Sequence, residues 1–332
     1  MPKKARPARP KVIITRRLPA PVEARMSELF DTVLNSEDKP MDRADLAAAM
    51  ADCDVLVPTV TDHLDADLIN AAPERLQMIA NFGNGVDHID LAAARKKGII
   101  VTNTPGVLTE DTADMAMALI LTTPRRFIEG DHIAQSGEWT GWSPTFLLGR
   151  RITGKRLGIV GMGRIGQAIA RRAHPFGLSI AYHNRHRLPA AAEEETGAQW
   201  VADLDELVAQ SDIISLNCPL NAASRHLIDA RRIALMKLTA FLINTARAEV
   251  CDEGALIEAL EQGRIAGAGL DVYHDEPHID PRLLALPNVV TLPHMGSATH
   301  EAREATGEKV IANIRTWVDG HRPRDQVLEG LI

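Results

Sequence analysis

Arg247, Glu276 and His294 each follow a short apolar stretch of the chain. Together these three side chains could catalyse the reduction of a keto acid. An arginine can hold a carboxylate, a histidine can deliver a proton, and a glutamate can orient that histidine. Ligands of open parallel sheets bind beyond the carboxyl ends of the strands, so we expect the three to share one edge. Each alone has a structural alternative, namely an ion pair, a solvated turn or a hydrogen-bonded histidine. Their joint position beside a nucleotide site favours catalysis.

A metal site is the alternative use of the polar residues around Glu276. His274, Asp275 and His278 lie close to it in sequence. Pro277 follows Glu276 directly, and a Glu-Pro turn explains the cluster without any ligand set. We therefore expect no metal.

The nucleotide site is predicted from the glycine-rich residues 161–166, which follow the apolar run 157–160 and precede an alanine-rich segment. This is the strand, turn and helix order of a dinucleotide-binding unit. The first glycine permits a sharp turn, the second lets a pyrophosphate approach the backbone, and the third lets the helix lie close to the strand. Free N–H groups at the helix start attract phosphate. The expected contacts are Gly161, Gly163, Arg164, Ile165 and Gly166.

The segment after the next expected strand indicates which dinucleotide binds. An NAD site usually has an acid about 20 residues beyond the glycines, which accepts from the ribose 2′-OH. No acid occurs between Gly166 and Glu193, and Asn184, Arg185 and Arg187 stand there instead. Arginine pairs with a 2′-phosphate through charge-assisted hydrogen bonds. We expect NADP(H) to be preferred, with NAD(H) possible; the alternative is a solvated basic turn.

Length and composition indicate a globular protein of two domains, with 332 residues of which 45% are hydrophobic and 24% charged. A net charge of −7 disfavours a nucleic-acid-binding surface. The three cysteines are widely spaced and suggest neither disulfides nor zinc, which favours a reducing cytoplasm. The basic, proline-rich residues 1–10 lack the apolar core of a signal peptide, and no apolar run is long enough to span a membrane.

Strands and helices alternate on both sides of the glycine turn. The expected strands are 11–15, 54–57, 76–80, 99–102, 157–160, 179–182, 213–217, 240–244, 266–270 and 289–292. Helices are expected between them, including 87–97, 111–122 and 299–319. The helix over 111–122 is apolar on nearly every side, so we expect it between domains or at a subunit interface. The alternation predicts an α/β fold with two Rossmann-like, doubly wound parallel-sheet domains and a cleft between them.

Taken together, these motifs resemble the D-isomer-specific 2-hydroxyacid dehydrogenase family over nearly the whole chain. The matching pieces are 81–90, 101–109, 161–166, 243–247, 267–272, 276–277 and 292–299. Within the family, 141–149 and 184–187 are most similar to glyoxylate/hydroxypyruvate reductases. Two positions depart from the family pattern, with Ala248 where glycine is common and Cys251 where valine is usual.

The resemblance implies a role for each group. Arg247 and the backbone N–H groups of Asn84 and Gly85 would bind the substrate carboxylate, while His294 would be the general acid and Glu276 its partner. Further cofactor contacts are implied for Thr112, Cys218, Pro219, Thr245 and Asp271. Trp142 resembles a tryptophan that enters the neighbouring subunit's site, so it counts as a substrate-site residue and implies a homodimer.

The resemblance also implies the domain layout and the activity. Residues 1–109 and 297–332 would form a discontinuous, flavodoxin-like substrate-binding domain, and residues 110–296 a dinucleotide-binding Rossmann domain. The implied activity is NADPH-preferring reduction of small 2-keto acids, glyoxylate and hydroxypyruvate, to D-2-hydroxy acids, without nucleic-acid or membrane partners. Two alternatives stay open: an NAD-linked D-2-hydroxyacid dehydrogenase of a larger substrate, and a nucleotide-sensing, corepressor-like binding protein.

Overall fold

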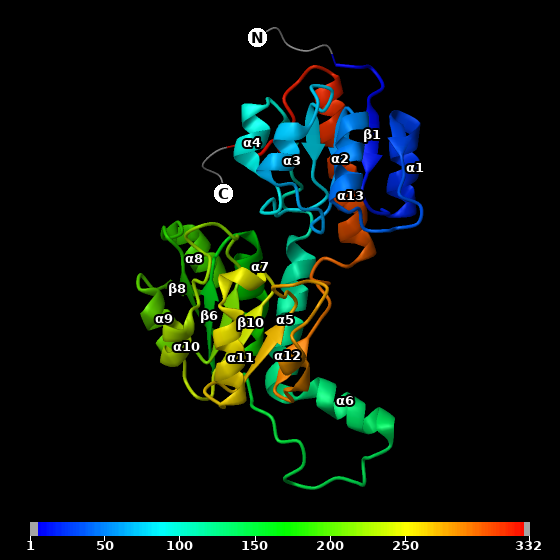
Figure 1. Ribbon diagram of the computed structural model, residues 1–332. Coiled ribbons are helices and arrows are strands. Elements are labelled where there is room, and N and C mark those ends of the chain that lie inside the picture. The colour runs from blue at the N-terminus through cyan, green and yellow to red at the C-terminus, as the bar shows by residue number, and fades with distance from the viewer. Residues whose placement is uncertain (1–5, 329–332) are drawn as a thin grey trace. The chain divides into compact units, whose positions relative to one another are not determined.

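The chain divides into two compact units, each built on one parallel sheet (Figure 1). The computed structural model describes residues 6–328; the first half of the basic N-terminal stretch and the last four residues of the C-terminal segment lie outside this range. One unit comprises Met1–Leu108 with Ala298–Ile332, and the other comprises Thr109–Ser297. The predicted class, α/β with two doubly wound parallel sheets, is confirmed.

The first unit has a five-stranded sheet in the order β2-β1-β3-β4-β5. Four strands lie within two residues of the predicted ranges: β1 (Lys11–Ile14), β3 (Val55–Val57), β4 (Met78–Ala80) and β5 (Ile100–Thr102). The edge strand β2 (Asp31–Val33) was not predicted, because its three residues carry no apolar run and it is defined only by pairing with β1. The loops after β3 and β4 are neighbours, since Phe82 N donates to Pro58 O at 2.9 Å.

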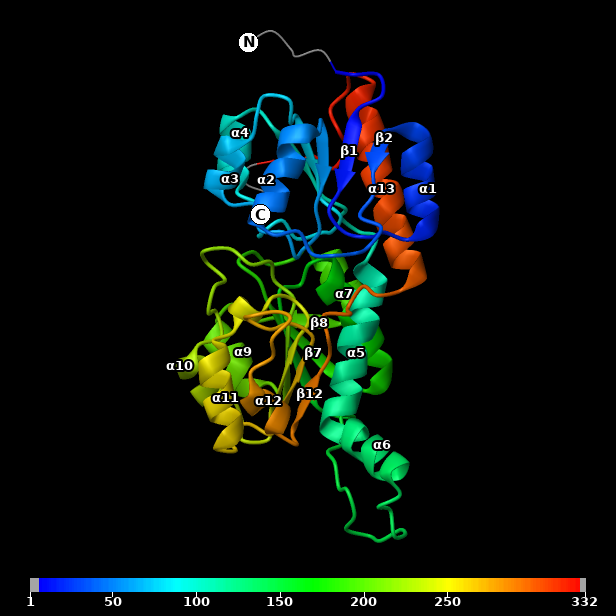
Figure 2. The ribbon, with the colours of Figure 1, turned by 45° about the vertical axis from the view of Figure 1, so that its right-hand side comes forward.

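Most helices of the first unit are preceded by a capping residue, whose side chain accepts a hydrogen bond from a backbone N–H of the first turn. These helices are α1 (Ala20–Leu29), α2 (Arg43–Asp52), α3 (Ala66–Ala71), α4 (Leu91–Lys96) and α13 (His300–Val318), of which only α1 lacks a side-chain cap. The predicted start of α4 at residue 87 is wrong, because Asp90 caps the helix by accepting from Ala93 N at 2.8 Å. Helix α13 packs beside α1 and buries Trp317 (Figure 2).

The second unit has a seven-stranded sheet in the order β12-β11-β10-β9-β6-β7-β8. Its strands are β6 (Arg156–Val160), β7 (Ser179–His183), β8 (Ala198–Trp200), β9 (Ile213–Leu216), β10 (Phe241–Asn244), β11 (Gly267–Leu270) and β12 (Val289–Thr291). Only β8 was not predicted; like β2 it is a three-residue edge strand. The strand order reverses at β6, whose neighbours are β7 on one side and β9 on the other, which makes this the switch point where such sheets bind ligands.

Eight helices belong to this unit: α5 (Thr109–Arg125), α6 (Phe127–Ser136), α7 (Arg164–Ala173), α8 (Ala190–Thr196), α9 (Leu204–Gln210), α10 (Ala230–Leu235), α11 (Glu253–Glu261) and α12 (Pro281–Ala285). Helix α5 packs against α7 and strands β10 to β12 of its own unit, which accounts for its apolar surface. Helix α6 was not predicted, and with residues 137–151 it forms an arm that projects from the sheet (Figure 1). Within residues 6–328, no helix combines the length and apolar character needed to cross a bilayer.

Candidate active site

The glycine turn between β6 and α7 has the shape of a phosphate-binding turn. Gly161 adopts a φ of +95°, and a Cβ there would stand 2.5 Å from the Cys218 nitrogen in the loop after β9. A Cβ at Gly166 would stand 2.4 Å from the Gly161 oxygen, so only glycine permits this helix approach. A Cβ at Gly163 would meet no described heavy atom within 4 Å, so a ligand can reach the backbone. The start of α7 at Arg164 has no side-chain cap, which leaves its first N–H groups for an anion.

Asn184 connects the end of β7 to the glycine turn. Its Oδ1 accepts from Met162 N at 2.7 Å. Asn184, which is predicted to contact the cofactor, therefore also holds the turn in place. This contact links the two segments that the dinucleotide prediction depends on.

The two arginines beyond Asn184 have different surroundings. Arg185 is exposed, and none of residues 6–328 pairs with its guanidinium. Arg187 instead donates to both carboxylate oxygens of Glu193, at 2.9 and 2.7 Å, and its guanidinium lies 5.7 Å from the ring centroid of Trp200. Tyr182 also donates to Glu193, at 2.6 Å. Of the two predicted phosphate contacts, only Arg185 is thus free to meet a ligand with its full set of donors.

The predicted catalytic groups lie at the carboxyl ends of three neighbouring strands, β10, β11 and β12. His294 Nδ1 is 2.7 Å from Glu276 Oε2, and Tyr273 N donates to Glu276 Oε1 at 3.0 Å. Burial raises the pKa of Glu276, but the hydrogen bond and charge of His294, the Tyr273 N–H and the charge on Arg247 outweigh it, so the net pKa lies below its usual value. An ionised carboxylate only accepts, so Nδ1 carries a proton and Nε2 is left to act on a substrate.

Asp271 supports the turn that carries His294. Its two carboxylate oxygens accept from Met295 N at 2.7 Å and Gly296 N at 2.8 Å. The side chain is almost fully buried, and this burial raises its pKa even though the two N–H groups and the charge on His294 act in the opposite direction. In addition to its predicted contact with the cofactor, Asp271 therefore has a structural role, which is to fix the residues next to His294.

Arg247 follows β10 in a turn that Asn244 organises. Asn244 Nδ2 donates to Arg247 O at 3.0 Å, and its Oδ1 accepts from Ala246 N at 3.0 Å. The hydroxyl of Thr245 in this turn is buried and has no hydrogen-bond partner among the described residues. A buried hydroxyl without a partner at the carboxyl end of β10 fits the cofactor contact expected for Thr245.

The remaining predicted residues lie elsewhere in the two units. Asn84 and Gly85 belong to the loop after β4 in the first unit. Thr112 is buried in α5, and Trp142 lies on the projecting arm with 82% of its surface exposed. Cys218 and Pro219 follow β9, and burial raises the pKa of the Cys218 thiol to about 11, so it stays protonated at neutral pH. No three of the described His, Cys, Asp and Glu side chains are grouped to hold a metal ion.

Comparison with known proteins identifies the family. The model of the D-isomer specific 2-hydroxyacid dehydrogenase NAD binding domain matches residues 117–296. The chain is 47% identical over 323 residues to the glyoxylate reductase of Thermococcus litoralis, covering 96% of this chain and 97% of that relative. The chain belongs to the D-isomer-specific 2-hydroxyacid dehydrogenase family.

Solved structures agree with this assignment. The glyoxylate reductase of Paecilomyes thermophila shares 35% identity at a TM-score of 0.86, covering 97% of this chain and 99% of that one. The NADPH-dependent glyoxylate/hydroxypyruvate reductase of Sinorhizobium meliloti, in complex with NADP and malonate, shares 35% identity at a TM-score of 0.86 and covers 97% of each chain. The predicted family and enzyme class, an NAD(P)-dependent oxidoreductase, are confirmed.

Sequence reasoning missed three side chains that organise this dehydrogenase. Glu193 holds Arg187, although its only signal was its place as the first acid after the glycine turn. Tyr273 bridges the ends of β11 and β12, since its hydroxyl lies 3.0 Å from Leu270 O and 2.9 Å from Leu292 O. Asn81 lies within a matching family motif, but nothing in its local pattern reveals what its amide contacts.

Proposed function

We propose that this dehydrogenase is an NADPH-preferring reductase of small 2-keto acids, such as glyoxylate and hydroxypyruvate, and forms D-2-hydroxy acids. The observation that carries the proposal is the 2.7 Å contact of His294 with Glu276 at the strand edge that also bears Arg247. The cofactor preference is supported by the exposed, unpaired Arg185 and by the absence of an acid between Gly166 and Glu193.

Each proposed catalytic residue has one task. Bound NADPH supplies the hydride for the carbonyl carbon. Arg247 binds the substrate carboxylate through its guanidinium fork and stabilises the charge that develops on the carbonyl oxygen. His294 hydrogen-bonds that oxygen through Nε2 and delivers the proton. Glu276, whose carboxylate is ionised at neutral pH, accepts from Nδ1 of His294 and so keeps Nε2 directed at the substrate.

We assign cofactor binding to the unit Thr109–Ser297, with contacts from the glycine turn, Asn184, Arg185, Thr112, Cys218, Pro219, Thr245 and Asp271. Arg187 acts there mainly through its pair with Glu193. The other unit would be the substrate-binding domain, in which the N–H groups of Asn84 and Gly85 would bind the carboxylate. This assignment is supported by the two N–H groups themselves, because neither has an acceptor among residues 6–328.

We further propose a cytoplasmic homodimer joined through the projecting arm. Trp142, Leu148 and Trp139 on this arm are 82%, 66% and 58% exposed, which is unusual for large apolar side chains unless a partner covers them. The three cysteines are free, as is typical of a reducing compartment. Sedimentation equilibrium should give a dimer mass, and a monomer would contradict this part of the proposal.

Turnover of glyoxylate and hydroxypyruvate with NADPH and NADH tests the function. We expect reduction of both acids, faster with NADPH, and His294→Ala should keep cofactor binding while losing about 100- to 10,000-fold in rate. A variant within about threefold of the parent would contradict the assignment of the general acid. A parent that turns over only larger keto acids with NADH, or that binds dinucleotide without turnover, would support one of the two alternatives.

A further inference from the structure

The loop after β4 has its carbonyl groups fixed and its N–H groups free. Asn81 Nδ2 donates to Gly83 O at 3.0 Å and to Gly85 O at 2.8 Å. Asn103 Nδ2 donates to Asn84 O at 2.8 Å, and Thr104 N donates to Gly83 O at 3.1 Å. Three consecutive carbonyls are therefore held, by Asn81 at the start of the loop and by donors from Asn103 and Thr104 after β5.

The N–H groups of the same segment have no such partners. Among residues 6–328, none accepts a hydrogen bond from the N–H groups of Gly83, Asn84, Gly85 or Val86. A trans peptide is planar, and its N–H points opposite to the carbonyl of the preceding residue. Holding the carbonyls of Gly83 and Asn84 therefore fixes the directions of the Asn84 and Gly85 N–H groups. These are the two donors assigned to the substrate carboxylate.

Asn81 is itself held in position by His88. The Asn81 side chain is 1% exposed, and its Oδ1 lies 3.0 Å from Nε2 of His88, which is also buried. An amide oxygen only accepts, so Nε2 carries the hydrogen of this contact. Both amide hydrogens and the amide oxygen of Asn81 are thus used. Losing His88 would leave a buried acceptor unpaired. Losing Asn81 would release the Gly85 carbonyl and leave the Gly83 carbonyl with only the Thr104 N–H.

We infer that Asn81 and His88 are positioning residues that aim the Asn84 and Gly85 N–H groups at the carboxylate of the 2-keto acid. Asn103 completes this arrangement through the Asn84 carbonyl. The inference rests on the proposed function, because it specifies how that substrate's carboxylate is held. Hydrogen bonds to a charged group weaken steeply with misalignment, so a preset loop binds more tightly than one that must order on binding.

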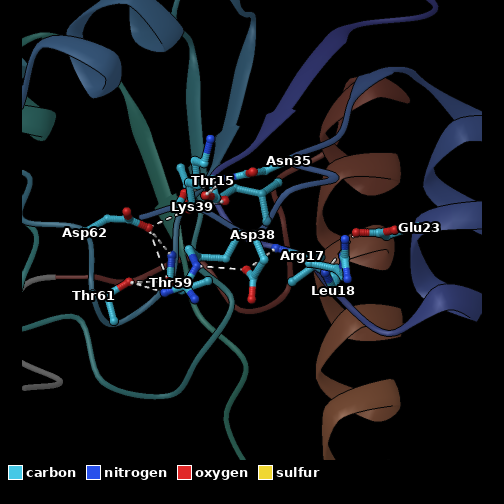
Figure 3. Close-up of polar contacts among 12 residues, drawn as sticks. Thr15, Arg17, Leu18, Glu23, Asn35, Asp38, Lys39, Thr59, Thr61 and Asp62 are labelled. Carbon is cyan, nitrogen blue, oxygen red and sulfur yellow. Dashed lines mark hydrogen bonds and ion pairs between the residues drawn. The ribbon is translucent and has the colours of Figure 1, made fainter. Parts of the chain in front are cut away.

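The chain offers a matched control in the same unit. Asn35 also donates from Nδ2 to two backbone carbonyls, those of Thr15 and Lys39, both at 2.7 Å (Figure 3). Its loop follows β2, at the opposite end of the sheet order from β4 and β5. Asn35→Ala therefore removes the same kind of contact without touching the loop of Asn84 and Gly85.

The experiment compares Asn81→Ala, His88→Leu, His88→Gln and Asn35→Ala. For each, KM and kcat for glyoxylate, inhibition by the carboxylate analogue oxamate, NADPH affinity by fluorescence and the melting temperature are measured. We expect Asn81→Ala and His88→Leu to raise KM and the oxamate inhibition constant on the order of 10-fold, the effect of one lost hydrogen bond to a charged group. NADPH affinity should stay within about twofold.

His88→Gln should restore much of the loss, because a glutamine amide can donate to Asn81 Oδ1 as the imidazole does. Asn35→Ala should lower the melting temperature but leave KM within about twofold. A KM that rises equally in Asn35→Ala would overturn the inference, because the effect would then follow stability alone. If Asn81→Ala does not fold, Asn103→Ala should show the same rise in KM, and an unchanged KM in that variant would overturn the inference.

The possible outcomes distinguish failure of this inference from failure of the proposed function. A parent protein that does not reduce glyoxylate would overturn the proposed function. An active parent whose folded Asn81→Ala and His88→Leu variants keep the parent KM would overturn only the positioning role.

Discussion

Arg185→Ala is expected to weaken NADPH use selectively. The guanidinium is free of protein partners within the described chain, so it can give all its donors to a 2′-phosphate. A hydrogen bond to a charged group is worth about 1.5–3 kcal/mol. Because Arg185 is exposed, water screens the pair and the lower end of this range applies, about 1.5–2 kcal/mol. At about 1.4 kcal/mol per decade, kcat/KM for NADPH should fall roughly 10- to 30-fold.

The matched control removes the neighbouring arginine together with its partner. Arg187 is held by Glu193 through two hydrogen bonds, so it should contribute much less to the phosphate. Alanine alone would leave the Glu193 carboxylate unpaired, and its charge would repel the phosphate. Arg187→Ala/Glu193→Gln avoids this effect and should change kcat/KM for NADPH by less than about threefold, the size of a marginal surface contact.

The assay is the ratio of kcat/KM for NADPH over NADH with glyoxylate held constant. NADH has no 2′-phosphate, so its kcat/KM should be nearly the same in the parent and in Arg185→Ala. A parent that prefers NADH, or an Arg185→Ala variant that keeps the parent ratio, would refute the NADP assignment. An equal fall in the control would instead show that Arg187 leaves Glu193 to bind the phosphate.

Two further predictions concern the strand edge. Arg247→Lys should be severely impaired with both cofactors, because lysine cannot fork onto a carboxylate; near-normal kcat and KM would place the carboxylate elsewhere. Glu276 has a folded-state pKa below its usual 4.5, so its stabilising effect is present above that value and is lost as pH falls through the folded pKa. The melting temperature of the parent should therefore exceed that of Glu276→Gln most near neutral pH, and the gap should narrow below about pH 4.5. A gap that stays constant down to about pH 3 would show that the ionised carboxylate is not the stabilising form.

The sequence predicted the fold because its strands are local features. Buried parallel strands are short apolar runs, and those that lie inside the two sheets occur within two residues of the predicted ranges. The edge strands β2 and β8 were not predicted because neither carries an apolar run. The equally short edge strands β5 and β12 do carry one and were predicted. Helix α4 begins later than predicted because the cap at Asp90 decides its start, and the apolar pattern does not.

Part of the candidate site was also predicted from local features of the sequence. Residue types at strand ends were sufficient to find Arg247, Glu276 and His294, because in a parallel sheet every strand ends at the same edge. The glycine spacing likewise identified the nucleotide turn, since each glycine is required by backbone geometry that the spacing itself reflects.

The sequence did not predict which side chains form hydrogen bonds or ion pairs with residues elsewhere in the chain. Arg185 and Arg187 look alike in sequence, yet only one is held by an acid, and Asp271 reaches N–H groups 24 and 25 residues away. Nothing in the sequence distinguishes the Asn81 amide, and its contacts with two carbonyls and His88 form only in the folded loop. Residue type fixes which hydrogen bonds a side chain can make, but only the tertiary structure decides which partners come within reach, and therefore which charges are left free for a ligand.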